Sequence, residues 1–287
     1  MMKRTVIRGS GRYLPPRLVT NNELSQWMDT SDEWIRQRTG IEQRYWTPPE
    51  GGLGSSDLGL EASKIAMQRA GWKPKDIDMI IFATLSPDFF FPGSGSLLQH
   101  KLGLDSIPAL DIRQQCTGFL YGMTTADAYI RSGLANRILL VGAEVHSCGL
   151  DISTNGRDVA VIFGDGAGVV CLEGAQTDEP VGVLASALHA DGAFAESLMV
   201  EAEGSRMKPR ITRELIEEGR HFPTMDGKTI FKLAVQKLPE VVNEVVKKAG
   251  LALDDIDLYI PHQANLRINQ FFAHSLKLPE EKVFNNI

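Results

Sequence analysis

One pattern occurs twice in this sequence, 179 residues apart (249 − 70), and it restricts the chain to folds built from two similar halves. An Ala-Gly pair followed by Asp-Ile-Asp and an apolar run occupies residues 70–81 and again 249–260. An amphipathic helix pattern precedes each copy, and Gly71 and Gly250 fit the position just after a helix, where a left-handed residue is preferred. Each copy therefore predicts a helix, a loop and a buried strand in succession, which is the unit from which layered α/β proteins are built.

A second repeated phrase indicates where the two halves lie along the chain. It occupies residues 100–104 and 274–278, an offset of 174 (274 − 100), and residues 174–180 between the halves are polar and turn-forming. We therefore predict an N-terminal half at residues 1–174 and a C-terminal half at residues 175–287. The same offset places the counterpart of position 116 at 290 (116 + 174), beyond the last residue, so the second half is expected to be incomplete at its C-terminus.

The composition excludes several classes of protein. With 287 residues, 43% of them apolar, it is long enough to bury a sizeable core. Its formal net charge of −6 disfavours a nucleic-acid surface, and no apolar run is long enough for membrane insertion. The three cysteines include no Cys-x-x-Cys pair and no signal sequence is recognisable, which indicates a cytoplasmic protein. Dispersed histidines predict no metal site.

Cys116 is the leading candidate for chemistry. It lies between a short apolar run at 107–112 and a helical pattern that ends near Gly133, so its sulfur is predicted at a helix N-terminus. Unpaired backbone N–H groups there favour the thiolate and are expected to lower the pKa of the thiol. The alternative is a buried small apolar residue. Cys148 lies in a polar loop and Cys171 in a strand-like run, and because neither opens a helix, both are assigned structural roles.

His262 directly follows the second copy of the repeated strand and precedes a helical pattern. Loops at the carboxyl ends of strands carry chemistry in α/β proteins, and a histidine can transfer protons or donate a hydrogen bond near neutral pH. Taken alone, His262 is better explained as an ordinary loop histidine. Paired with Cys116 in equivalent halves, it becomes a candidate catalytic residue.

Three further features have structural alternatives. The Gly-rich segment 163–168 lacks the Lys-Ser/Thr of a phosphate loop, so nucleotide binding is rejected in favour of close backbone packing. Three aromatic residues at 89–91 are typical of a core or a subunit interface, and they could also line a ligand site. Four basic residues are expected either to form a positive surface at a tunnel mouth or to be scattered solvated charges: Lys228, Lys232, Lys237 and Arg267.

Several motifs, in one order, resemble the β-ketoacyl-acyl-carrier-protein synthase III family of the thiolase superfamily. The resemblance covers nearly the whole chain. Its motifs lie at residues 30–35, 38–41, 107–122, 163–168, 225–227 and 261–267. It implies an α/β, thiolase-like fold of duplicated αβαβα layers, with the second half incomplete at its C-terminus.

The resemblance also implies a condensing enzyme of fatty acid biosynthesis, an acyltransferase without a tightly bound cofactor. Cys116 would take an acyl group from acyl-CoA. Decarboxylation of malonyl-acyl-carrier protein would then give a carbanion that attacks this group and forms β-ketoacyl-acyl-carrier protein. His262 matches the histidine that stabilises the enolate. In relatives, an asparagine and a glycine loop from a later segment assist these steps.

Binding roles follow from the same resemblance. Trp34 and Arg157 would hold the CoA adenine between them, with Thr30 and Arg38 also at the nucleotide end. Phe91 would reach across a homodimer to close the acyl tunnel of the partner subunit. Two basic residues match positions that dock the acidic carrier protein: Lys232 and Arg267.

Two alternatives stay open. Gln114 and Gln115 stand where many fatty-acid-initiating members have small residues, which is typical of relatives that make secondary metabolites. A specialised acyltransferase or condensing enzyme is therefore one alternative. A naturally short chain could instead be a non-catalytic subunit that binds acyl-CoA or carrier protein, although binding alone does not need Cys116. Acyl chain length is left open, because tunnel depth depends on packing.

Overall fold

The computed structural model describes residues 2–287, and the chain divides into two compact units. The first consists of the segments up to Arg17, Tyr45–His146 and Gly164–Leu188. The second consists of the segments Leu18–Arg44, Ser147–Phe163 and His189–Ile287. Each unit therefore combines parts that are distant in the sequence, and the division into halves at residue 174 stays a prediction.

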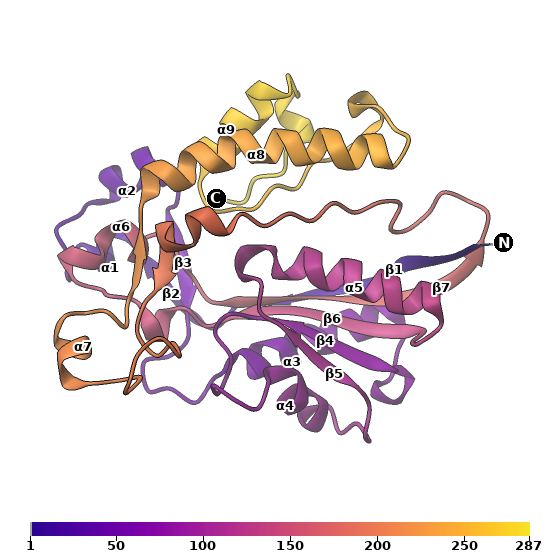
Figure 1. The fold of residues 1–287 in the computed structure, drawn as a ribbon, viewed down its shortest axis with the longest axis horizontal. Helices are drawn as coiled ribbons and strands as arrows, with labels where there is room; N and C mark the ends of the chain where they lie inside the picture. Colours follow the sequence, from indigo (N-terminus) through magenta and orange to yellow (C-terminus); the bar gives the residue numbers. More distant parts are fainter. Residues whose placement is uncertain (1) are drawn as a thin grey trace. The chain divides into compact units, whose positions relative to one another are not determined.

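A five-stranded mixed sheet forms the centre of the first unit (Figure 1). Its strands, in spatial order, are β1 (Met2–Tyr13), β7 (Gly166–Thr177), β6 (Arg137–Glu144), β4 (Met79–Ala83) and β5 (Ala109–Ile112). β4 runs parallel to both neighbours, with Ile81 opposite Leu110 on one side and Leu140 on the other. Because β4 is buried on both faces, it is a continuous apolar run, as the repeat predicted. The carboxyl ends of β4, β5 and β6 meet at one edge of the sheet.

Helices cover both faces of this sheet (Figure 1). They are α3 (Ser55–Ala70) and α4 (Ser94–Lys101) on one face and α5 (Gly118–Ser132) on the other. Alternate residues of β4 separate the two cores, because Ile80 and Phe82 pack with α3 whereas Ile81 packs with α5. The helix predicted after Cys116 is confirmed, and it ends at Gly133, whose φ of 81° is left-handed.

The second unit is mainly helical. Its helices are α1 (Asn21–Leu24), α2 (Asp32–Thr39), α6 (Arg157–Ala160), α7 (Arg213–Glu217), α8 (Gly227–Lys248) and α9 (Leu266–Ser275). Outside the five-stranded sheet, the chain forms two small sheets, one of β2 (Arg17–Thr20) with β3 (Gln43–Trp46) and one of β8 (Leu198–Val200) with β9 (Pro223–Met225). The long α8 and α9 pack together around Tyr259, Phe272 and Val283. Within residues 2–287, no helix combines the length and apolar character that a bilayer crossing requires.

Local geometry confirms the first repeat. Gly71 and Gly250 have φ angles of 69° and 73°, so both preceding helices are followed by a left-handed glycine. Asp76 Oδ2 accepts a hydrogen bond from the backbone N–H three residues earlier at 2.7 Å, and Asp255 Oδ2 accepts the equivalent bond at 2.8 Å. The two copies of the pattern therefore form the same helix end and the same turn.

The second copy differs from the first in its strand. The prediction of a second buried strand is wrong in extent, because residues 255–260 form a single parallel bridge, between Tyr259 and Val283. Tyr259 is buried, but Leu258 and Ile260 are exposed to 47% and 69%. A strand needs a hydrogen-bonded neighbour along its length, and the described residues provide one only at Tyr259. The polar segment predicted to separate the two halves begins at residue 174, which lies inside a strand, because β7 extends to Thr177.

Candidate active site

Cys116 lies between β5 and α5, in a 3₁₀ turn formed by Gln115–Thr117, and it is exposed. The start of α5 rests against the end of β4, since a Cβ added to Gly118 would lie 3.2 Å from the Cβ of Ala83. This close approach favours glycine. Gln115 has a φ of 44°, a left-handed conformation that residues other than glycine rarely adopt. Such strain is concentrated at functional sites.

The ionisation of Cys116 differs from the prediction. Although the residue is exposed, the atoms packed around its sulfur withhold solvent, and this burial raises the pKa of the thiol. Its own backbone N–H lowers the pKa, and the negative charge of Glu144 raises it. The expected lowering by the helix end is therefore wrong, because loss of solvation outweighs the amide hydrogen bond. A raised pKa favours the thiol over the thiolate at neutral pH.

The carboxylate of Glu144 organises the end of β4. It accepts hydrogen bonds from the backbone N–H groups of Leu85 (3.0 Å) and Ser86 (3.1 Å). The hydroxyls of Thr84 (3.2 Å) and Ser86 (2.5 Å) donate to it as well. Ser86 Oγ in turn accepts from the N–H of Val145 at 2.8 Å. Sequence reasoning missed Glu144 and Ser86, although their position at the carboxyl ends of two parallel strands could have indicated them.

The Gly-rich segment contains a buried carboxylate. Asp165 is only 4% exposed, and it accepts hydrogen bonds from the backbone N–H groups of Thr47 (2.6 Å) and His146 (2.8 Å). Burial lowers the pKa of His146, although the charges of Glu144 and Asp165 oppose this shift. Asp165 therefore ties this segment to the residue that follows β6 by two positions. A Cβ added to Gly166 would lie 3.3 Å from Leu14 Cδ2, whereas one added to Gly168 would have no neighbour within 4 Å, so the predicted close packing holds at Gly166 and not at Gly168.

His262 lies in the loop before α9. Although the residue is exposed, the atoms packed around its imidazole withhold solvent from the ring and lower its pKa, so the neutral form predominates at pH 7. Gln263 Nε2 donates to the carbonyls of Pro261 (2.9 Å) and Phe284 (3.0 Å), which ties the two sides of this loop together. The side chain of Asn265 caps α9. Sequence reasoning quoted both amides as part of a motif but missed their role in holding the histidine loop.

Trp34, Arg38 and Arg157 form one cluster in the second unit. The guanidinium carbons of Arg38 and Arg157 lie 4.2 and 4.5 Å from the centroid of the Trp34 ring, within cation–π range. Arg157 also donates to the carbonyl of Asp29 at 2.5 Å. The next residue is Thr30, whose buried Oγ1 has no hydrogen-bond partner among residues 2–287. The structure thus brings together the four residues assigned to the nucleotide end.

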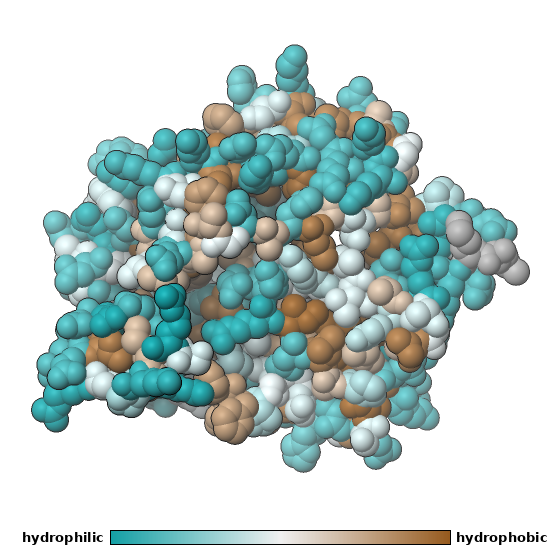
Figure 2. All heavy atoms as spheres, in the orientation of Figure 1, coloured by the Kyte–Doolittle hydropathy of each residue, from teal (hydrophilic) through white to brown (hydrophobic). Residues whose placement is uncertain are grey.

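The basic residues assigned to docking lie on the two long helices. Lys232 is on α8 and Arg267 is on α9, where its guanidinium carbon lies 5.8 Å from the ring of Phe231. Lys237 forms an ion pair with Glu240 at 2.7 Å, which offsets its charge. Hydrophilic residues predominate along α8 on the face drawn in Figure 2. On this surface, the positive charge of Lys237 is therefore offset by a neighbouring carboxylate.

Phe91 lies at the tip of the loop between β4 and α4, next to Phe89 and Phe90. The exposed fractions are 59% for Phe89, 62% for Phe90 and 79% for Phe91. A core position within this chain is therefore wrong for them, because a core residue would be shielded from solvent. An interface or a ligand wall stays as the prediction.

The predicted site residues are divided between the two units. Cys116 and Phe91 belong to the first, and the others, including His262, belong to the second. The facing of Cys116 and His262 stays a prediction. Among residues 2–287, no group of three or more His, Cys, Asp or Glu side chains is arranged to hold a metal ion.

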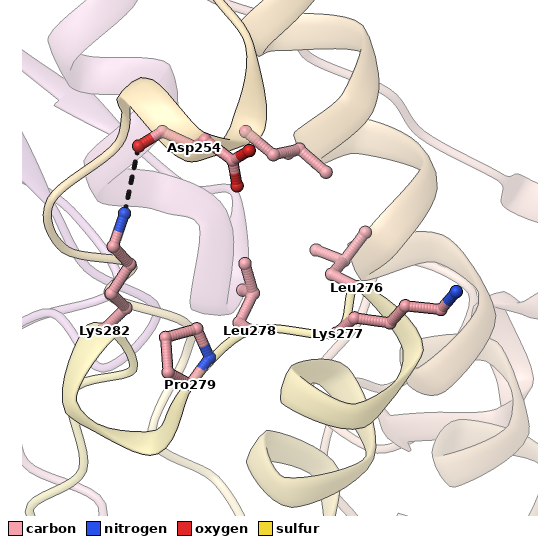
Figure 3. A pocket seen from close by; sticks show the side chains of 7 residues that line it. Asp254, Leu276, Lys277, Leu278, Pro279 and Lys282 are labelled. Atoms are coloured by element: carbon pink, nitrogen blue, oxygen red, sulfur yellow. Dashed lines mark hydrogen bonds between the residues drawn. The ribbon is translucent and has the colours of Figure 1, made fainter.

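A hollow of about 400 Å³ lies in the second unit, beside the end of α9 (Figure 3). Its lining includes Lys282, whose Nζ donates to the carbonyls of Asp254 (3.0 Å) and Ile256 (2.7 Å). Lys282 therefore joins two turns of the backbone. The lining contains no cysteine or histidine, so this hollow is not part of the candidate active site.

Comparisons with known proteins cover the whole chain. A sequence model of the 3-oxoacyl-[acyl-carrier-protein] synthase III family matches residues 110–192, and one of the C-terminal part of that family matches residues 246–287. The 3-oxoacyl-[acyl-carrier-protein] synthase III of Aquifex aeolicus VF5 is 37% identical over 99% of this chain and 84% of its own, with a TM-score of 0.87. The synthase III of Pseudomonas aeruginosa PAO1 is 36% identical over 99% and 83%, with a TM-score of 0.88. The priming β-ketosynthase of the R1128 polyketide pathway is 29% identical over 100% and 82%, with a TM-score of 0.84.

These matches confirm the predicted fold class, a thiolase-like α/β arrangement with helices on a mixed sheet. The identity of 37% extends over nearly the whole chain, so the similarity goes beyond shared architecture. The chain therefore belongs to the 3-oxoacyl-[acyl-carrier-protein] synthase III family of condensing enzymes.

Proposed function

We propose that this chain transfers an acyl group from acyl-CoA to Cys116 and condenses it with malonyl-acyl-carrier protein, the first condensation of fatty acid biosynthesis. One observation carries the proposal. Cys116 is exposed in a strained turn at the start of α5, beside the carboxyl ends of parallel strands, in a member of this family. A nucleophile placed there can reach a bound substrate.

The proposed reaction consists of an acyl transfer and a decarboxylating condensation. Cys116 Sγ attacks the thioester carbonyl carbon, the bond from that carbon to the sulfur of CoA breaks, and CoA leaves as a thiol with the proton that Cys116 loses. The malonyl group then loses carbon dioxide, and the resulting carbanion bonds to the acyl carbon while the bond to Sγ breaks. Sγ leaves as a thiolate and takes up a proton from solvent. The product is a β-ketoacyl thioester on the carrier protein.

His262 is proposed to stabilise the enolate of the second half-reaction. Its pKa is lowered, so the neutral imidazole has one N–H to donate and one nitrogen that can accept a proton. Hydrogen bonds to a developing enolate oxygen stabilise the transition state when the donor is held in place. The amide of Gln263 supplies this restraint, because it ties the backbone on one side of His262 to residue 284.

The cluster around Trp34 is proposed as the site of the CoA adenine. Arg157 now stacks on Trp34 at 4.5 Å, whereas an adenine ring between them needs roughly 7 Å, two van der Waals contacts. The Arg157 side chain therefore swings outward when CoA binds. Arg38 and Thr30 are proposed to contact the nucleotide end, where the buried Thr30 hydroxyl offers an unused hydrogen bond.

Partners and location complete the proposal. Lys232 and Arg267 are proposed to dock the acidic carrier protein through charge complementarity. The exposed Phe91 is proposed to close the acyl tunnel of a second copy in a homodimer, which would cover its apolar surface. We place the enzyme in the cytoplasm, and we propose that it works without a tightly bound cofactor.

Intact mass measurement after incubation with acyl-CoA tests the first half-reaction. The wild-type chain is expected to gain one acyl group, and Cys116→Ala is expected to gain none. Cys148→Ala is the matched control, because Cys148 is also exposed, and it should acylate normally. An adduct that survives in Cys116→Ala, or no adduct in the wild type at saturating donor, contradicts the proposal.

Release of carbon dioxide from malonyl-acyl-carrier protein tests the second half-reaction. His262→Ala is expected to keep the acyl adduct but to release carbon dioxide at least roughly 100-fold more slowly, which is a typical contribution of a positioned proton donor. Equal loss of both steps would contradict this role of His262.

A specialised condensing enzyme is the second candidate function. The observation that favours it is the pair of bulky polar residues Gln114 and Gln115 beside the nucleophile, with Gln115 in a left-handed conformation. A panel of acyl-CoA donors separates the two candidates. Fastest acylation by acetyl-CoA supports fatty acid initiation, whereas fastest acylation by a long or branched donor supports the specialised enzyme.

A further inference from the structure

We propose that Glu144 is a positioning residue for acyl-donor selection: its carboxylate fixes the turn at residues 84–86, and this turn sets the position of the aromatic loop 87–93. The inference rests on the function proposed above and deepens it. Glu144 belongs to none of the motifs or repeats that the sequence displays, and it does not need to touch the substrate to act.

Both oxygens of Glu144 bind the turn. Oε1 accepts from the N–H of Leu85 at 3.0 Å, and Oε2 accepts from the N–H and the hydroxyl of Ser86 at 3.1 and 2.5 Å. Hydrogen bonds to an ionised acceptor are shorter and stronger than those between neutral groups. Ser86 is also held from the opposite side, because the hydroxyl of Ser55, at the start of α3, donates to its carbonyl at 2.5 Å. The turn is therefore anchored between β6 and α3.

Both ends of the aromatic loop are anchored by other polar contacts. The carboxylate of Asp88 accepts from the N–H and the hydroxyl of Ser56 at 3.1 and 2.7 Å. The N–H of Asp88 donates to the hydroxyl of Ser94 at 3.2 Å, and Asp111 accepts from the N–H of Gly95 at 2.9 Å. The loop is thus an arch with polar ends, and its tip consists of the exposed residues 89–91.

The arch begins next to the nucleophile. Cys116 follows β5, the turn at residues 84–86 follows β4, and Glu144 is the last residue of β6, so all three stand at the same edge of neighbouring parallel strands. The start of α5 also contacts Ala83, the last residue of β4, through Gly118. A displacement of the turn is therefore a displacement of the wall beside the acylated sulfur. Errors of about 1 Å in such positioning cost roughly 100-fold in rate.

Two other roles of Glu144 have to be separated from positioning. The carboxylate could act only through its charge, or it could only stabilise the fold. Glu173 provides the matched control for stability, because it accepts from Arg137 Nε at 2.7 Å and Arg8 Nε at 2.6 Å. Arg137 is the first residue of β6 and Glu144 is the last, so the carboxylates of Glu173 and Glu144 form their hydrogen bonds at opposite ends of this strand.

The experiment measures acylation rates with two donors, acetyl-CoA and octanoyl-CoA, by intact mass on the full chain. Glu144→Ala removes all acceptors, and Glu144→Gln removes the charge and replaces one acceptor oxygen by a donor. Both are expected to change the ratio of the two rates by about tenfold, because several hydrogen bonds that orient the site are lost together. Glu144→Asp, which keeps two acceptor oxygens and the charge, is expected to restore the ratio. Glu173→Ala should leave it unchanged.

Two further measurements make the positioning role specific. Hydrogen exchange of the Leu85 and Ser86 amides is expected to accelerate in Glu144→Gln, since both donate to the carboxylate. Alkylation of Cys116 by iodoacetamide at pH 7 is expected not to fall in any Glu144 variant, because the nucleophile itself stays in place. A merely structural role would lower both acylation rates by the same factor, without a change in the donor ratio.

The outcomes that overturn the inference are distinct from those that overturn the proposed function. An unchanged donor ratio in both Glu144→Ala and Glu144→Gln, with acylation intact in the wild type, overturns the inference alone. A change of equal size in Glu173→Ala, or unchanged exchange of the two amides, does the same. No adduct on wild-type Cys116 overturns both.

Discussion

Alkylation of Cys116 as a function of pH distinguishes two opposing accounts of its reactivity. If a helix end lowered the thiol pKa to about 6, most of the sulfur would be thiolate at pH 7 and the rate would be almost level above it. In the structure, loss of solvation and the charge of Glu144 raise the pKa instead. Even an ordinary cysteine, with a pKa of about 8.5, is only roughly 3% thiolate at pH 7. A raised pKa makes the fraction smaller, so the rate should increase about tenfold between pH 7 and 8.

The assay is labelling with iodoacetamide followed by intact mass. A Cys148→Ala background is needed because Cys148 is exposed and reacts independently. Cys171 is the internal negative control, because it is fully buried and burial raises its pKa to about 12. Glu144→Gln removes the negative charge that opposes ionisation of Cys116, so this variant should label faster than the wild type at pH 7.

A labelling rate that is level between pH 7 and 8 would refute the reasoning, because it would mean that Cys116 is already thiolate at neutral pH. Slower labelling of Glu144→Gln at pH 7 would contradict the role assigned to the charge of Glu144. A free cysteine peptide measured in parallel corrects the profile for the chemistry of the reagent.

Three further predictions concern the stability of the fold and the binding of CoA. Burial raises the pKa of Cys171 to about 12, so this thiol ionises at lower pH in the unfolded chain than in the folded one. The free energy of unfolding, measured in urea, should therefore fall as the pH rises from about 9 to 12, and the fall should be smaller in Cys171→Ala. Arg157→Ala should weaken CoA binding about 2- to 30-fold, because the variant cannot stack a guanidinium on the bound adenine and such a contact with an aromatic ring is worth roughly 0.5–2 kcal/mol. Unchanged affinity in a fluorescence titration would exclude the proposed adenine site. Lys277 has a φ of 54°, so Lys277→Gly should raise the free energy of unfolding by about 0.5–1 kcal/mol, whereas Lys248→Gly, in the last turn of α8, should lower it by a similar amount.

Local structure could be predicted from the sequence because its causes act over a few residues. The period of apolar residues predicted α5, and Gly133 predicted its end. The repeated Ala-Gly and Asp-Ile-Asp pattern predicted two equal helix ends, which the φ angles of Gly71 and Gly250 confirm. The motifs also predicted the family, since their order is specific. Cys116 was placed correctly before a helix for the same reason.

Features that depend on distant segments were decided only by the tertiary structure. The pKa of Cys116 is raised by atoms from other elements and by the charge of Glu144, which no pattern around the cysteine contains. The extent of the strand at Tyr259 depended on the neighbour available to it. Arg157 stacks on Trp34 although 123 positions (157 − 34) separate them. The sequence by itself determined helix ends, turns and the position of Cys116 at the start of a helix, because these follow from backbone preferences. The tertiary structure decided solvation, charge and pairing, because these are properties of what packs around a residue.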